Sequence, residues 1–262
     1  MNFNYQMRFS KAGRARFISH LDTLSCLVRA VRRTGFELAF SQGMRPKPLL
    51  SLAMPLGVGV EGEDEICDFS LSQRAPLAEL AKKLARELPQ GMELGSVGPS
   101  FDRAKAAARV ESCAYRIELT ETPTGSAEDA GLRAGEARTA GLAAKLADAA
   151  EKYNEAAAMV VLRKRPKGDK EVDIKKYVSR VEPLSGGGIG GHGHGHGGGI
   201  AFEMKVTSEG TARPEEIVAA LARLAGREFR PASIVRTGIS LREEEQPRPP
   251  RPGRPGPRGH RY

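Results

Sequence analysis

Positively charged residues gather near the start of the chain in a pattern that suits anion binding. Residues 1–50 hold nine arginines and lysines against two acidic residues, a net charge of +7. Three of the arginines lie outside the apolar stripe predicted for a helix that follows Ser19. A rigid loop carrying two further cations follows that helix, because two prolines fix φ and a glycine permits a sharp turn. The stripe is Leu21, Leu24, Val28 and Val31, and the loop is Ser41, Gln42, Gly43, Met44, Arg45, Pro46, Lys47 and Pro48.

Clustered cations on a helix and a rigid loop can hold phosphates. The sequence therefore predicts one anion-binding surface, with RNA as a candidate partner and ordinary surface charge as the competing interpretation. The predicted binding residues are Arg16, Arg29, Arg32, Arg33, Arg45 and Lys47. With few aromatic residues in the chain, contacts to the RNA backbone are expected rather than base stacking.

His20 is the candidate for acid–base chemistry. It falls in the first turn of the predicted helix, where the helix dipole disfavours the charged imidazolium. With Lys11 and Arg16 nearby, it could act as general base in metal-independent RNA cleavage. A surface or capping histidine is the competing interpretation.

Two further groups have the chemistry of metal ligands. His192, His194 and His196 alternate with glycine and could chelate a transition metal, but a glycine-rich segment offers no supporting contacts. Five carboxylates crowd one predicted strand connection, where they could bind Mg²⁺ or protect a sheet edge from aggregation. These are Glu61, Glu63, Asp64, Glu65 and Asp68. No metal or cofactor is expected to be bound.

A second basic run lies in the other half of the chain and could extend an RNA-facing surface or form a solvated hairpin. It comprises Arg163, Lys164, Arg165, Lys167, Lys170, Lys175 and Lys176. The three cysteines, Cys26, Cys67 and Cys113, are about 40 residues apart, which fits buried thiols and no disulfide framework. The chain shows neither a membrane span nor a secretory signal, so a cytoplasmic protein is expected.

The elements that position these residues form a repeated pattern. Strand, helix, strand, strand, helix and strand follow one another twice, which predicts an α/β protein of the α+β sandwich type with two ferredoxin-like halves. The alternation of Tyr5, Met7 and Phe9 predicts a strand, Ser19 with Asp22 predicts the start of the first helix, and Pro214 predicts the start of the last one. Phe36–Phe40 and Leu49–Leu56 are also predicted strands. The predicted domains are residues 1–105 and 106–245, with a Gly/His-rich insertion at 185–199. Residues 246–262 are rich in Pro, Arg and Gly and predict a disordered tail.

The stretches SHLD, RAVRRTG, SQGMRPKP and SLAMPLGVGVE resemble the radical SAM-linked protein family, which is found beside or fused behind radical SAM proteins. The resemblance covers residues 5–100 closely and 111–241 more loosely. It implies a radical SAM protein as partner and supplies no activity. Because the chain has no complete catalytic signature, the expected function is that of a non-catalytic accessory or adaptor protein acting with this partner. The chain lacks the CxxxCxxC spacing that holds a radical SAM [4Fe–4S] cluster. The alternative function is the ribonuclease centred on His20.

Overall fold

The computed structural model describes residues 2–102, 104–121, 132–166, 168–184 and 198–243. The first half of the chain contains four strands and two α-helices. In order, its elements are β1 (Phe3–Lys11), the 3₁₀ turn η1 (Gly13–Phe17), α1 (His20–Arg33), β2 (Leu50–Leu52), β3 (Glu61–Leu71), α2 (Leu77–Glu87) and β4 (Met92–Pro99).

The second half repeats this order with one insertion. It begins at α3 (Ala106–Arg109), β5 (Val110–Glu121) and α4 (Leu132–Glu155). A small hairpin, β6 (Val160–Arg163) and β7 (Lys170–Asp173), and the turn η2 (Ile174–Lys176) are inserted after α4. The half ends with β8 (Val181–Leu184), β9 (Gly198–Lys205), α5 (Pro214–Ala225) and β10 (Phe229–Leu241). No described helix is long and apolar enough to cross a bilayer.

Both halves arrange their four strands in the same permuted order. The first half runs β4–β1–β3–β2 and the second runs β10–β5–β9–β8, and every pair within a half is antiparallel. This is the strand order that two ferredoxin-like βαββαβ units produce, so the predicted fold class is confirmed. The division at residue 105 stays a prediction.

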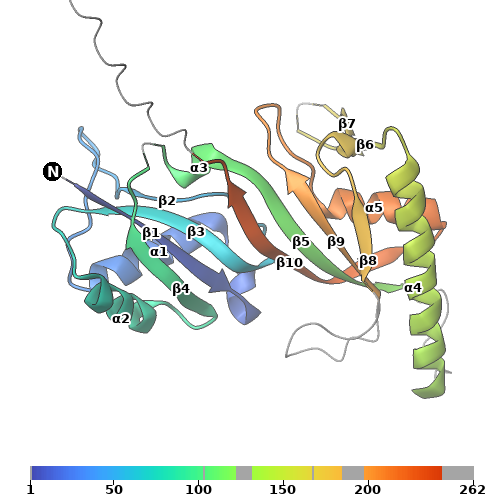
Figure 1. The fold of residues 1–262 in the computed structure, drawn as a ribbon, viewed down its shortest axis with the longest axis horizontal. Helices are drawn as coiled ribbons and strands as arrows, with labels where there is room; N and C mark the ends of the chain where they lie inside the picture. The colour runs from blue at the N-terminus through green and yellow to red at the C-terminus, as the bar shows by residue number, and fades with distance from the viewer. Residues whose placement is uncertain (1, 103, 122–131, 167, 185–197, 244–262) are drawn as a thin grey trace, which may run out of the picture.

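The two halves share one eight-stranded sheet, which Figure 1 shows running across the molecule. The junction is a short parallel pairing of β10 with β3, in which Val235 lies opposite Glu61 and Arg236 opposite Gly62. Farther along β3, the same edge pairs with β2 instead, where Leu52 lies opposite Cys67. The edge of β3 is therefore divided between a strand of its own half and a strand of the other half.

Each half has its own apolar core. The boundary between the two cores differs from the boundary between the two sets of four strands in the shared sheet. Tyr5, Met7 and Phe9 alternate inward from β1 in the first core. Leu142, Leu146, Ala149 and Tyr153 of α4 lie in the second core, as their spacing predicts. Leu56 and Val60, from the connection before β3, also pack into the second core. The first half thus supplies part of the packing of the second.

The predicted strand at Phe36–Phe40 is wrong. That segment makes only isolated bridges, from Leu38 to Leu71 and from Phe40 to Pro48. Leu38 pairs with the end of β3, whereas Phe40 pairs with Pro48 across the neck of the loop at residues 41–48, so the segment changes partner and no continuous ladder forms. The strand predicted at Leu49–Leu56 is also shorter, because only Leu50–Leu52 pairs with β3 before the chain turns away.

The glycine-rich insertion ends earlier than the sequence predicts. Gly198 and Gly199 belong to β9. A Cβ on Gly198 would lie 2.6 Å from Leu146 Cδ1, so this glycine lets α4 pack closely on the strand. His192, His194 and His196 and the tail at 246–262 lie outside the described residues.

Candidate anion-binding surface

Helix α1 presents its arginines on the side opposite its buried face. Ser19 caps the helix, accepting a hydrogen bond from the Asp22 backbone N–H at 3.2 Å. The buried face is centred on Leu27, which is 0% exposed. At about 100° per residue, the three arginines fall on the far side of the helix from Leu27. Arg29, Arg32 and Arg33 are all exposed.

The prediction that Leu21 is buried is wrong, since its side chain is 71% exposed. Leu21 lies about 120° around the helix from Leu27, outside the buried face. Thr23 is buried instead and donates a hydrogen bond to the Ser19 carbonyl at 2.8 Å. Periodicity alone favoured the larger apolar residue over the threonine.

The loop at residues 41–48 is closed at its neck and exposed at its tip. The Ser41 N–H donates to the Lys47 carbonyl at 2.8 Å, and the Lys47 N–H donates to Ser41 Oγ at 3.0 Å. Gly43 has φ of +127°, a conformation that other residues rarely adopt. Arg45 and Lys47 are exposed, and so is Met44 at the tip. The loop therefore holds two cations away from the body of the protein.

Most of the described cations fall into two groups, those that pair with a carboxylate and those that are exposed without one. Most arginines of the sheet contact a carboxylate, as Arg8 does with Asp64 and Arg116 with Glu63. No described carboxylate pairs with Arg29, Arg32, Arg33, Arg45 or Lys47, which we call the basic surface. No described hydrogen bond joins the loop to α1. The binding of one ligand by both parts therefore stays a prediction.

Arg16, the sixth predicted binding residue, lies in a different environment. Its Nη1 donates to Glu61 Oε1 at 3.0 Å, and its guanidinium lies 4.8 Å from the centroid of the Phe17 ring. Its Nε is buried without a partner among the described residues. Arg16 thus belongs to an ion pair between η1 and β3, apart from the basic surface.

His20 lacks the neighbours that the ribonuclease hypothesis assigns to it. Its Nδ1 is buried and has no hydrogen-bond partner in the described structure. Lys11 is 1% exposed, and its Nζ donates to the Ile18 carbonyl at 3.0 Å. Since Arg16 is paired with Glu61, neither cation is free to contact an RNA phosphate beside His20.

A buried charged cluster of Lys11, Glu65 and Arg236 lies where the two halves meet. Arg236 is 1% exposed and forms a two-pronged ion pair with Glu65, Nε to Oε1 at 2.8 Å and Nη2 to Oε2 at 2.5 Å. The same guanidinium donates to the carbonyls of Pro55 and Met54, each at 3.1 Å. These carbonyls belong to the chain after it has left the edge of β3. Arg236 therefore supplies donors where the strand ladder stops.

The electrostatics of this cluster follow from burial and from Glu65. Burial lowers the pKa of Lys11, although the Glu65 carboxylate opposes the shift and Arg236 adds to it. Burial alone would lower the pKa of Arg236, but the hydrogen bonds and charge of Glu65 raise it. Glu65 thus neutralises charge between two buried cations. Sequence analysis missed the cluster, although one signal was present: Glu65 is in phase with the inward-facing Cys67 and Phe69.

The acidic residues of β3 do not form the charged sheet edge that was predicted. β3 lies inside the sheet, paired with β1 on one side and with β2 and β10 on the other. Each carboxylate faces a donor on another element, and no described group of acidic, histidine or cysteine side chains could hold a metal ion. The partners are Arg16 for Glu61, Arg116 for Glu63, Arg8 for Asp64, Arg236 for Glu65, and Gln6 and the Ala106 N–H for Asp68.

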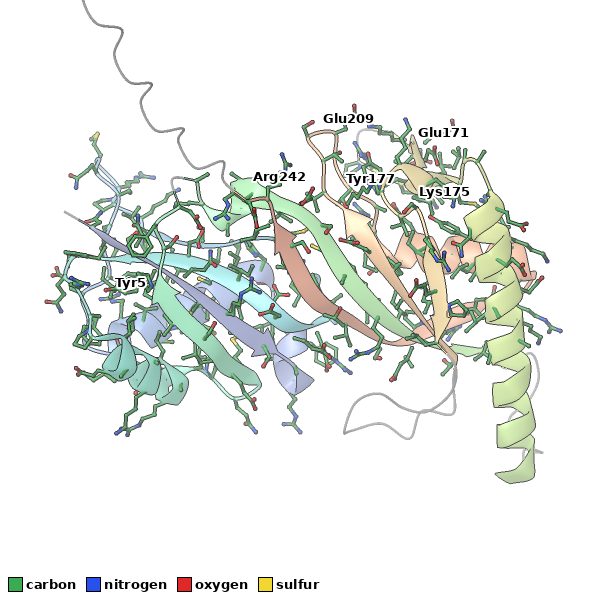
Figure 2. All side chains as sticks on the ribbon, in the orientation of Figure 1. Tyr5, Glu171, Lys175, Tyr177, Glu209 and Arg242 are labelled. Carbon is green, nitrogen blue, oxygen red and sulfur yellow. The ribbon has the colours of Figure 1, made fainter. Side chains whose placement is uncertain are left out.

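The second basic run is divided between structural and exposed side chains. Arg163 makes a two-pronged ion pair with Glu216, at 2.6 and 2.7 Å, in which both side chains are mostly buried. Lys175 donates to the carbonyls of Asn154 and Ser179. Lys164, Arg165, Lys170 and Lys176 are exposed, and Lys167 lies outside the described residues. Figure 2 places Glu171, Lys175 and Tyr177 at the β6–β7 end of the second half.

All three cysteines are free thiols, as predicted, although Cys26 is only partly buried. Burial raises the pKa of Cys113 to about 11, and burial also raises the pKa of Cys67. Both thiols are therefore protonated at neutral pH and pack as small apolar side chains.

Comparisons with known proteins place the chain in a family. A protein described as an unknown protein from Galdieria sulphuraria matches with 13% identity over 88% of this chain and 98% of its own, at a TM-score of 0.24. A putative glycine cleavage system transcriptional repressor matches with 9% identity over 90% and 99%, at a TM-score of 0.23. The curated proteins give no match. The model of one family, described as "Uncharacterized protein conserved in bacteria (DUF2344)", matches residues 4–214, and the chain belongs to that family.

Proposed function

We propose that this protein is a non-catalytic accessory protein that binds RNA through its basic surface and acts with a radical SAM enzyme. The radical SAM partner comes from the resemblance of the SHLD and SQGMRPKP stretches. The observation that carries the RNA contact is the set of five exposed cations without a described carboxylate partner. Elsewhere in the sheet, arginines such as Arg8 and Arg116 face carboxylates of β3.

The contrast between paired and unpaired cations supports a polyanion as ligand. An exposed arginine without a partner retains its full charge and its donors for an external phosphate. Arg29 donates only to the Ser25 carbonyl of its own helix and to Cys26 Sγ. The pinned neck of the loop also lowers the entropy that Arg45 and Lys47 lose on binding.

A salt titration of RNA binding tests the first arm of the proposal. Fluorescence anisotropy would follow a labelled 20-nucleotide poly(U) against KCl concentration. If about four of the five cations contact phosphates, the slope of log K against log salt is near −3, because each contact contributes about −0.7. Changing Arg29, Arg32 and Arg33 to glutamine should flatten the slope by about 2 and weaken all sequences alike.

The matched control removes three charges from elsewhere in the same half. Arg74, Lys82 and Arg86 are exposed, and the last two lie on the neighbouring helix α2. Their change to glutamine alters net charge equally and should leave the slope unchanged. An equal effect in both triple variants, or a salt-insensitive interaction, would show that the basic surface is not the binding site.

The partner arm is tested separately with purified proteins. The chain and a radical SAM protein from the same organism should co-elute in size-exclusion chromatography. Met44 is a fully exposed apolar side chain at the tip of the loop, so Met44→Glu should weaken co-elution. Phe101→Glu changes another exposed apolar side chain and serves as control. The two tests are independent. Failure to co-elute with the radical SAM protein leaves the RNA result unaffected, and failure to bind RNA leaves the co-elution result unaffected.

The ribonuclease alternative gains no support from the geometry around His20. A general base must reach the 2′-hydroxyl proton, with cations nearby to hold the phosphate. Lys11 and Arg16 are both engaged in contacts with the protein itself. The accessory role therefore fits the described contacts better.

A further inference from the structure

A cavity with a volume of about 650 Å³ lies beside the junction, on the second half of the molecule. Its walls come from four parts of the chain: the connection at residues 54–60, strands β5 and β9, strand β6, and the start of α5. None of its lining residues belongs to α1 or to the loop at 41–48. The cavity is therefore separate from the basic surface, and cavities of this size accommodate drug-sized ligands.

The inner wall of the cavity is apolar and held in place. Tyr115 is 6% exposed and stacks on Phe202, with ring centroids 5.6 Å apart and planes at 21°. Met54 and Met204 also line the cavity, and the Met54 carbonyl is fixed by Arg236. An aromatic ring beside two thioethers offers a surface for a flat or aliphatic apolar group.

The outer wall is fixed by the ion pair between Arg163 and Glu216. Besides its two bonds to Glu216, Arg163 donates to the Thr211 carbonyl at 3.0 Å. This ties the β6–β7 hairpin to the start of α5. The Glu216 carboxylate also accepts from the Arg213 N–H at 2.9 Å, so the first turn of the helix is already capped. The cavity is thus formed without a ligand.

The charged side chains left over at the cavity favour an anion. Arg163 and Glu216 neutralise each other, and both are mostly buried. Lys164 and Arg213 are exposed cations that have no ion-pair partner in the described part of the chain, whereas Glu215 is the one remaining carboxylate among the lining residues. The cavity therefore combines an apolar inner wall with a net positive charge.

We propose that this cavity binds a small organic anion, with its apolar body against Tyr115, Met54 and Met204 and its anionic group near Lys164 and Arg213. The anionic group is a carboxylate, sulfonate or phosphate, each of which accepts charge-assisted hydrogen bonds from lysine and arginine. The proposal does not depend on RNA binding.

The test uses the full chain and two fluorescent probes of the same shape. 8-Anilinonaphthalene-1-sulfonate carries a sulfonate, and N-phenyl-1-naphthylamine is its neutral counterpart. Both should bind, and Ala219→Trp, on an exposed position of α5 that lines the cavity, should abolish the binding of both. Changing Lys164 and Arg213 together to glutamine should raise the Kd of the anionic probe about tenfold and leave the neutral probe unchanged.

Lys170 and Lys176 provide the matched control. Both are exposed cations of the same half that do not line the cavity. Their double change to glutamine should leave both probes unaffected. Near-UV circular dichroism and Tm would verify that each variant is folded. Binding of the anionic probe that survives Ala219→Trp, or that falls equally in the two double variants, would overturn the proposal.

Discussion

The junction between the halves gives the sharpest test of the structure, through the change Arg236→Met. The methionine keeps much of the aliphatic volume but removes every donor. Glu65 would be left 2% exposed without its two-pronged partner, and the carbonyls of Met54 and Pro55 would lose their donor. The change therefore removes the ion-pair partner of a buried carboxylate and the hydrogen-bond donor of two backbone carbonyls at the same position.

The expected loss in the free energy of unfolding is about 3–5 kcal/mol, which is typical of breaking a buried ion pair by removing one partner. The positive charge of buried Lys11, which interacts with Glu65, reduces the loss. The two carbonyls add to it, because each loses the donor that Arg236 supplies. For a chain of this size, such a loss lowers Tm by roughly 6–20 °C.

The double variant with Glu65→Met separates charge from packing. Removing both partners leaves no unpaired carboxylate, so the double variant should be at least about 1 kcal/mol more stable than Arg236→Met alone. Arg116→Met is the control, because Arg116 of β5 pairs with Glu63 of β3 and also joins the two halves. That pair is partly exposed, so its loss should cost about 1 kcal/mol or less.

Urea unfolding followed by far-UV circular dichroism, at pH 7 and 25 °C, measures the wild-type protein, the single variants Arg236→Met, Glu65→Met and Arg116→Met, and the double variant. A loss of stability in Arg236→Met no larger than that in Arg116→Met would refute the role given to the Glu65–Arg236 pair. So would additive effects of Arg236→Met and Glu65→Met, since the two side chains would then not interact. An altered dependence on urea in Arg236→Met would mean that the halves unfold separately once the junction is broken.

Three further predictions follow from single positions. Gly62→Ala should destabilise the protein by more than Gly98→Ala, because a Cβ at Gly62 would lie 2.5 Å from Glu65 Oε1 whereas Gly98 has open space; thermal unfolding compares them. As pH rises from 9 to 11, the Cys113 thiol should lower stability by about 2 kcal/mol, because its pKa is raised to about 11 and it keeps its proton only in the folded state; in urea titrations Cys113→Ala should reduce the fall by that amount and leave the contribution of Cys67, whose pKa is also raised. His20→Ala should leave poly(U) binding unchanged in anisotropy and the RNA intact on gels, and cleavage lost in this variant would restore the ribonuclease hypothesis.

Local sequence patterns, such as strand alternation, a helix cap and a first-turn proline, predicted several helices and strands correctly. The alternation of Tyr5, Met7 and Phe9 predicted β1, and Ser19 with Asp22 predicted the start of α1. Pro214 predicted the start of α5, where it occupies the first turn. The repeated order of strands and helices predicted two ferredoxin-like halves. These features depend on residues that are close together in the chain.

The features that were missed depend on contacts between distant segments. Glu65 and Arg236 are 171 positions apart, and only the parallel pairing of β3 with β10 brings them together. The acidic run of β3 looked like a protected edge because nothing local shows that β10 covers it. Leu21 was misplaced because the width of the buried face of α1 is set by the sheet beneath it. The cavity likewise needs four separate segments and has no local signal.

The junction also implies an order of events during synthesis. β10 is the last strand of the sheet to leave the ribosome, whereas every other strand of both halves precedes it. Until β10 arrives, part of the edge of β3 has no partner strand, and Glu65 lacks its guanidinium. A nascent chain therefore carries an open strand edge and an unneutralised inward carboxylate from the synthesis of β3 until that of β10. Arrival of Arg236 closes both at once, so among the described strands the sheet is completed only when β10 has been added.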